Sequence, residues 1–180
     1  MEMIEKKEFY FIRHGQTDYN VLKSKVDHED VSLNQVGFLQ AQTIEPLVAD
    51  LPIRSVCCSP LKRAKETKEI ISARLDATHY EIPDLGECTM QIWREMTLLG
   101  GDALKSSSEP VRAFMQKVAD GINQALSFEG PVLIVAHGGV HWAVCCLMGV
   151  EEHEWVIGNC LPVHFSLQRE GIWRAKKLVG

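Results

Sequence analysis

Two histidines and two arginines in this chain could together bind and attack a phosphoryl group. Arg13 and His14 are adjacent, Arg63 follows a Ser-Pro pair, and His137 precedes two glycines. A planar guanidinium pairs well with phosphate oxygens. Together, Arg13, Arg63 and His137 could balance the roughly two negative charges of a phosphoryl group. A neutral imidazole can also attack phosphorus and form a covalent intermediate. The residue types therefore predict phosphoryl chemistry in which the histidines serve as nucleophile or as charged donors.

Such a reaction also needs a proton for the leaving alkoxide, which a nearby carboxylic acid can supply. Glu87 is the candidate, because it lies in a loop after a predicted strand. Glu81 and Asp84 are the alternatives in the same stretch. We expect Glu87 to complete the site.

A metal site is the alternative interpretation of the residues around His137. His137, His141 and Cys145 are spaced four residues apart, as on a zinc-binding helix face. They lack the Glu of a His-Glu-x-x-His pattern, and the glycines after His137 favour a turn. We therefore expect no metal and no cofactor, with His141 at a pocket edge or surface and Cys145 in the core.

The elements that must position these residues alternate along the chain. Apolar runs at Phe9–Arg13, Ile53–Cys58 and Val132–Ala136 are typical of buried strands, and Thr78–Ile82 is a further candidate. The first three runs end at or just before the arginines and histidines. Because ligands of parallel sheets bind beyond the carboxyl ends of the strands, we expect these side chains to meet at one edge.

Helices are expected between the strands. Residues 36–47 carry apolar side chains at helical spacing, with a kink or an interruption expected at Pro46. Ser59-Pro60 is typical of a helix start and predicts a helix to about Leu75, with Arg63 in its first turn. Further helices are expected from Ser108 and from His137, a surface loop at 100–110, and a final hairpin from 163–168 and 172–176. This order predicts a three-layer α/β/α sandwich with a mostly parallel sheet.

Composition limits the remaining function classes. The chain has 180 residues with 19 Lys+Arg against 24 Asp+Glu, a net charge of −5, which argues against a general nucleic-acid binder. The length predicts a single domain over residues 1–180. No apolar run approaches the ~18 residues of a membrane helix, and no signal segment is evident. The six cysteines include adjacent pairs in apolar runs, which suit packed thiols, so we expect a cytoplasmic protein.

The motifs resemble those of the histidine phosphatase superfamily, also called phosphoglycerate mutase-like. The segment from Arg13 to Asn20, Arg-His-Gly-Gln-Thr-Asp-Tyr-Asn, looks like the signature of that superfamily. The helix segment from Ser59 to Thr67, the Leu-Gly-Glu loop ending at Glu87, and the turn Val-Ala-His-Gly-Gly around His137 follow in the family order. The match extends from Phe9 to about Met148.

The resemblance implies a role for each matched residue. His14 would be the phosphorylated nucleophile, and Glu87 the general acid and then the base that activates water. Arg13, Arg63 and His137 would bind the phosphoryl group, with Asn20 and Ser59 also near it. The family needs no metal and has the phosphoglycerate mutase-like fold.

The motifs indicate the substrate less directly than they indicate the reaction. Val26-Asp27 and the stretch Gln91–Glu95 depart from the common family pattern beside the pocket. Trp93 and Trp142 could line a pocket, but packing in the core is the preferred interpretation. The chain lacks the insertion and the Arg-x-Tyr-Gly-like stretch typical of mutases, which favours hydrolysis of a small phosphorylated metabolite. A cofactor-dependent phosphoglycerate mutase and a weakly active phospho-ligand-binding protein are the alternatives.

Overall fold

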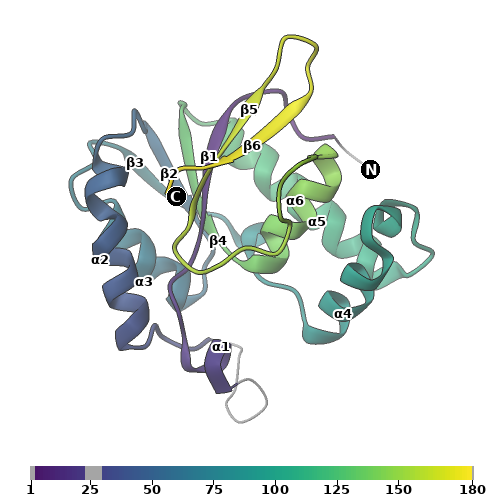
Figure 1. Ribbon diagram of the computed structural model, residues 1–180, viewed down its shortest axis with the longest axis horizontal. Helices are drawn as coiled ribbons and strands as arrows, with labels where there is room; N and C mark the ends of the chain where they lie inside the picture. Colours follow the sequence, from purple (N-terminus) through teal and green to yellow (C-terminus); the bar gives the residue numbers. More distant parts are fainter. Residues whose placement is uncertain (1–2, 23–29, 180) are drawn as a thin grey trace.

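The computed structural model describes residues 3–22 and 30–179, and a six-stranded sheet lies at its centre (Figure 1). The strands are β1 (Phe9–Arg13), β2 (Ser55–Cys58), β3 (Thr78–Glu81), β4 (Val132–Ala136), β5 (Pro162–Leu167) and β6 (Trp173–Lys177). Their order across the sheet is β3-β2-β4-β1-β5-β6. The first four strands pair in parallel, whereas β5 is antiparallel to β1 and β6 to β5. The predicted, mostly parallel sheet and the final hairpin are confirmed.

Helices cover both faces of the sheet. They are α1 (Asp18–Leu22), α2 (Gln35–Ala49), α3 (Lys62–Ile71), α4 (Met90–Leu99), α5 (Glu109–Leu126) and α6 (Gly138–Met148), with short 3-10 helices η2 (Pro83–Leu85) and η3 (Gly100–Lys105). Figure 1 shows α2 and α3 on one face and α5 and α6 on the other. The predicted three-layer sandwich is therefore confirmed. No helix in the described ranges is long and apolar enough to cross a membrane.

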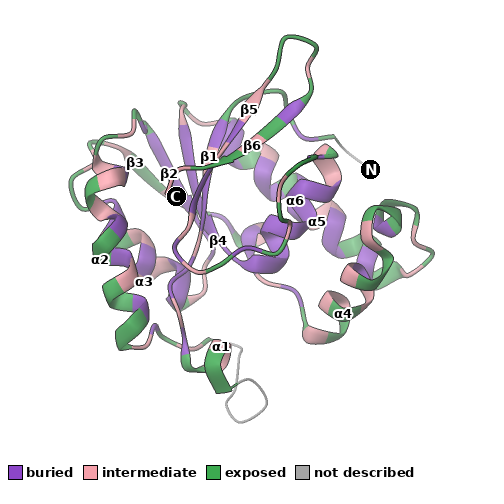
Figure 2. Ribbon diagram, in the orientation of Figure 1, coloured by how far each residue is buried: buried purple, intermediate pink, exposed green. Residues whose placement is uncertain are grey.

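The central strand β4 supplies both cores. Every residue of β4 is buried (Figure 2). Because side chains alternate across a strand, Ile134 joins the core under α5 and α6, while Leu133 and Val135 join the core under α2 and α3. This burial on both faces explains why the run reads as continuously apolar.

Two helix boundaries differ from the sequence prediction. Helix α3 begins at Lys62 rather than at Pro60, because the Ser59 hydroxyl accepts the Leu61 N–H at 3.2 Å and Leu61 itself is extended. Helix α2 continues through Pro46 to Ala49, so of the two expected effects of this proline an interruption is excluded. Pro46 lies in the last turn of the helix. Its ring removes one backbone N–H donor there, and few helical hydrogen bonds follow it that could be disturbed.

Two helical segments between residues 90 and 105 were not predicted from the sequence. Helix α4 was not predicted, although the Thr89 side chain caps it by accepting the Ile92 N–H at 3.3 Å. The surface loop expected at 100–110 contains η3 in its first half. The Val26-Asp27 departure lies outside the described residues.

Candidate active site

The sheet order brings the first two chemical motifs together. β1 and β4 are neighbours, with Arg13 paired to Ala136, and the His14 N–H donates to the Ala136 carbonyl at 3.0 Å. On the other side of β4, the Ser59 N–H donates to the Val135 carbonyl at 3.1 Å. The carboxyl ends of β1, β4 and β2 therefore place His14, His137 and Ser59 side by side at one edge, as predicted for a parallel sheet.

The backbone fixes the orientation and the tautomer of His14. Its Nδ1–H donates to the carbonyl of Gly15 at 2.7 Å, which leaves the lone pair on Nε2. The ring is buried, and burial together with Arg13 and Arg63 lowers the pKa of His14 well below its usual range. The imidazole is therefore neutral near pH 7 and carries a lone pair suitable for nucleophilic attack.

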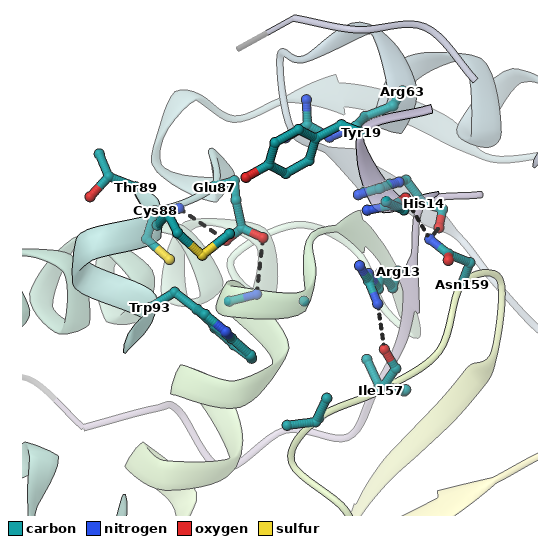
Figure 3. A pocket seen from close by; sticks show the side chains of 15 residues that line it. Arg13, His14, Tyr19, Arg63, Glu87, Cys88, Thr89, Trp93, Ile157 and Asn159 are labelled. Carbon is teal, nitrogen blue, oxygen red and sulfur yellow. Dashed lines mark hydrogen bonds between the residues drawn. The ribbon is translucent and has the colours of Figure 1, made fainter. Parts of the chain in front are cut away.

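Two guanidinium groups lie beside this imidazole (Figure 3). The Arg13 Nη1–H donates to the Ile157 carbonyl at 2.7 Å, and its buried Nε has no hydrogen-bond partner among the described residues. Arg63 comes from the first turn of α3 and is buried. Burial lowers the pKa of both arginines from a very high starting value, so both remain cationic. An anion would supply the partner that the Arg13 Nε lacks.

His137 adjoins His14, although it is not among the residues that line the cavity. The ring centroids of the two histidines are 5.2 Å apart. His137 Nε2 is 2.7 Å from the Ser59 hydroxyl, and its buried Nδ1 has no partner among the described residues. Burial, and then His14 and Arg63, lower the pKa of His137 well below its usual range. A neutral His137 that accepts the Ser59 O–H at Nε2 would carry its proton on Nδ1.

The N-terminus of α6 holds the carboxylate of Glu87. One carboxylate oxygen accepts the Gly139 N–H at 3.1 Å, and the other accepts the Cys88 N–H at 2.9 Å (Figure 3). A Cβ on residue 139 would collide with this carboxylate, so glycine is required for the close approach. Glu87 lines the cavity, whereas Glu81 and Asp84 do not.

A second close backbone approach supports the loop after β1. A Cβ on Gly15 would lie 2.6 Å from the Gly37 carbonyl, and one on Gly37 would overlap the Gln16 backbone. The Gly15 N–H donates to the Thr67 hydroxyl at 3.0 Å. Helices α2 and α3 therefore hold the segment that carries His14.

The cavity has a volume of about 360 Å³ and both polar and apolar lining residues. The polar lining residues include Arg13, His14, Asn20, Arg63, Glu87 and Asn159. The other lining residues are largely apolar or aromatic and include Tyr19, Cys88, Met90, Trp93, Val156 and Ile157. Of the two tryptophans that could line a pocket, Trp93 lines this cavity (Figure 3), whereas Trp142 packs against Trp155 with ring centroids 5.1 Å apart.

Asn159 is the polar lining residue that the sequence analysis missed. Its side-chain N–H groups donate to the His14 carbonyl at 2.9 Å and to the Asn20 amide oxygen at 3.3 Å. Asn20 also accepts the Thr17 N–H at 3.0 Å, so its oxygen is engaged by the protein. No spacing in the sequence relates Asn159 to His14, because their contact depends on the loop after α6.

The three residues with metal-like spacing, His137, His141 and Cys145, do not form one cluster in the structure. His137 belongs to the site just described, while His141 lies further along α6 with its ring next to Cys145. His141 is fully buried, so its expected place at a pocket edge or surface is wrong. Helical spacing places His141 and Cys145 on one side of α6, facing the core.

Residues 9–178 match the sequence profile of the histidine phosphatase superfamily, branch 1. The chain belongs to this superfamily. This histidine phosphatase is 33% identical over 178 residues to the uncharacterized phosphatase PhoE of Bacillus subtilis, covering 92% of this chain and 90% of PhoE. It is 30% identical over 179 residues to the agropine synthesis reductase of Rhizobium rhizogenes, of which it spans only 39%.

A solved structure shows the same fold. This histidine phosphatase superposes on the alpha-ribazole phosphatase from Shigella flexneri with a TM-score of 0.65 at 21% identity. The match covers 95% of this chain and 94% of the other. The architecture is therefore that of the superfamily over nearly the whole chain.

Proposed function

We propose that this histidine phosphatase hydrolyses small phosphate monoesters through a phosphohistidine on His14. The observation that carries the proposal is the tautomer of His14, which leaves the Nε2 lone pair between Arg13 and Arg63. In the first step, Nε2 bonds to phosphorus as the ester P–O bond breaks, and Glu87 protonates the departing oxygen. In the second step, Glu87 takes a proton from water, the water oxygen bonds to phosphorus, and the P–Nε2 bond breaks.

Buried donors would stabilise the charge on the transferring group. The partnerless Nε of Arg13 and Nδ1 of His137 can each donate to a phosphoryl oxygen. Leaving such donors buried and unpaired costs about 1–3 kcal/mol each, and a bound phosphoryl group removes that cost. Because the two arginines supply the positive charge, we propose that catalysis needs no metal ion.

The walls of the cavity favour a substrate with one anionic group. Among the described lining residues, the cationic side chains are those of Arg13 and Arg63, and both adjoin His14. The remainder of the substrate would contact apolar lining residues such as Trp93, Met90 and Ile157. A second carboxylate or phosphate would meet no further cation among the described lining residues, which argues against 3-phosphoglycerate and against the mutase alternative.

The central test is the release of phosphate from p-nitrophenyl phosphate with a chelator present. We expect wild-type turnover, and a loss of at least about 10⁴-fold in His14→Ala. His79→Ala is the matched control, because His79 is exposed on β3 and should retain full activity. Absence of wild-type turnover would instead support the phospho-ligand-binding alternative.

Trapping the intermediate tests the mechanism separately. Protein quenched during turnover should carry acid-labile phosphate on His14, and label on another residue would refute the assignment. Supplying 3-phosphoglycerate with a bisphosphate primer distinguishes the remaining alternative. We expect no conversion to 2-phosphoglycerate, and rapid conversion would identify a mutase.

We also propose a cytoplasmic location. All six cysteines are buried thiols outside any disulfide, which is typical of proteins in a reducing compartment. Fractionation of the cells that make the protein would test this, and recovery in a secreted fraction would contradict it.

A further inference from the structure

A second cluster of chemically active side chains lies outside the catalytic cavity. His141 and Cys145 are one turn apart on α6, and His153 lies in the loop that joins α6 to β5 (Figure 1). One ligand atom from each residue lies within 4.8 Å of the other two. His141 and Cys145 are buried, and His153 is partly exposed. None of these residues lines the cavity.

Hydrogen bonding directs the lone pair of His141 into this cluster. The His141 Nδ1–H donates to the Trp155 carbonyl at 2.8 Å, which leaves Nε2 unprotonated. Nε2 lies 3.2 Å from His153 Nε2 and 3.8 Å from the Cys145 sulfur. A backbone carbonyl on the far nitrogen is how metal-binding histidines are usually oriented.

The separations fit a tetrahedral metal ion. Zinc binds nitrogen at about 2.0–2.1 Å and sulfur at about 2.3 Å, which separates two nitrogen ligands by about 3.3 Å and nitrogen from sulfur by about 3.6 Å. The observed 3.2 Å and 3.8 Å are within a few tenths of an ångström of these values. The Cys145 sulfur is also 3.9 Å from His141 Nδ1, so it lies beside the ring and not on the axis of the Nε2 lone pair. The thiol must therefore turn toward Nε2 and His153 for all three residues to bind one ion.

We propose that His141, Cys145 and His153 bind one divalent zinc-like ion. Two imidazoles and a thiolate select borderline transition metals such as Zn²⁺ over Mg²⁺ and Ca²⁺, which prefer oxygen ligands. The ion enters from the partly exposed side of His153, where water completes the tetrahedron. Binding releases the thiol proton of Cys145 to solvent.

The ion would stabilise one wall of the catalytic cavity. His153 belongs to the loop that also carries Ile157 and Asn159, whose groups contact Arg13 and the His14 carbonyl. A metal bound to His153 and to two residues of α6 ties this loop to the core. Its role is therefore structural, and it supplies no group to the reaction.

Titration of the purified, chelator-stripped full chain with Co²⁺ tests the site directly. We expect saturation at one equivalent, with visible bands of a tetrahedral ion and a near-ultraviolet thiolate-to-cobalt band, both lost on adding Zn²⁺. Cys145→Ser should abolish the thiolate band. The matched control is Cys146→Ser, which removes the adjacent buried thiol, whose sulfur lies 4.0 Å from the Gly100 carbonyl instead.

His153→Gln provides the second variant, because a partly exposed side chain can change without emptying the core. Loss of a group that only orients a ligand costs about 10- to 100-fold in metal affinity, so loss of this ligand should cost at least about 100-fold. Zn²⁺ should also raise the unfolding midpoint of wild type and of Cys146→Ser but not of His153→Gln. Absence of saturable binding by wild type, or unchanged affinity in His153→Gln, would overturn the proposal.

Discussion

His14 and His137 are imidazoles that the fold keeps neutral. Burial is the largest cause of the lowered pKa of each ring, and neighbouring arginines add to it. In the unfolded chain the same residues titrate at about pH 6.5. Below that pH the unfolded state therefore binds protons that the folded state does not, and the free energy of unfolding must decrease as the pH falls.

This linkage predicts the acid sensitivity of the protein. Each buried histidine should lower the free energy of unfolding by on the order of 1 kcal/mol per pH unit below pH 6.5. Urea unfolding between pH 7.5 and 5.5 measures the slope, and His14→Gln should reduce it. The control His79→Gln, at an exposed position on β3, should change the slope less. An equal change in both variants would contradict the origin assigned here.

In the proposed mechanism, Glu87 acts on the leaving-group oxygen of the scissile bond. Glu87→Gln removes the proton donor while keeping a side-chain oxygen for the Gly139 N–H. Hydrolysis of an alkyl phosphate should slow by about 10²–10⁴-fold, because its alkoxide needs a proton. p-Nitrophenyl phosphate has a leaving group that departs without protonation and should slow far less. Equal losses for both substrates would indicate a different acid.

At the scale of elements, the site depends on how closely helices approach the loops. Helix α6 meets Glu87 at Gly139, where a methyl group would displace the carboxylate. The methyl group would also overlap the Cys88 sulfur, and both side chains must shift to admit it. Gly139→Ala should therefore reproduce the kinetics of Glu87→Gln, with a lower kcat for alkyl phosphates and a smaller effect on p-nitrophenyl phosphate. Steady-state kinetics with both substrates checks this. Unchanged kcat values would show that the carboxylate can move without loss.

Helix α2 meets the His14 loop at Gly37. Here the obstacle to a methyl group is backbone, which cannot rotate away as a side chain can. Gly37→Ala should therefore cost about 1–3 kcal/mol in the free energy of unfolding, the usual penalty for overpacking. Gly101→Ala is the control, since it has open space around it. Urea unfolding of both variants measures the difference, and equal stability would contradict the close packing.

The elements also show which structural features the sequence could predict. β4 was predictable because burial on both faces requires an uninterrupted apolar run, and the residues after β1 and β4 were then assigned to one sheet edge. The start of α3 was not, because Ser59 is also suited to the turn that it forms with Leu61. Asn159 was not predictable at all, since it is 145 residues away from His14 in the sequence and reaches it only through the conformation of the loop after α6.

At the scale of the whole molecule, β4 joins both cores. We propose that residues 1–180 therefore form one cooperative domain. All four tryptophans pack in or against the core that contains Ile134, while Leu133 lies in the other core. Leu133→Ala should lower the free energy of unfolding by about 2–5 kcal/mol, the usual cost of such a core deletion.

The tryptophans make this prediction specific. Leu133→Ala should shift the unfolding midpoint followed by tryptophan fluorescence as far as the one followed by circular dichroism, although the substitution is on the opposite face of the sheet. A fluorescence midpoint that stayed in place while circular dichroism changed would show two independently unfolding units. Ile134→Ala, on the tryptophan side, provides the comparison.

The charge of the whole molecule does not reveal the site. A net charge of −5 suggests no affinity for anions, yet Arg13 and Arg63 converge on His14 at one edge of the sheet. This local concentration depends on strand order, which composition does not contain.

The position of β1 has a consequence for synthesis on the ribosome. β1 is the first strand made, but it lies between β4 and β5, so its partners follow more than a hundred residues later. Until residues 132–136 emerge, the nascent chain carries an apolar segment with unpaired edges, open to association with other chains or with a chaperone. We therefore expect the yield of folded protein to depend on how quickly translation reaches β4.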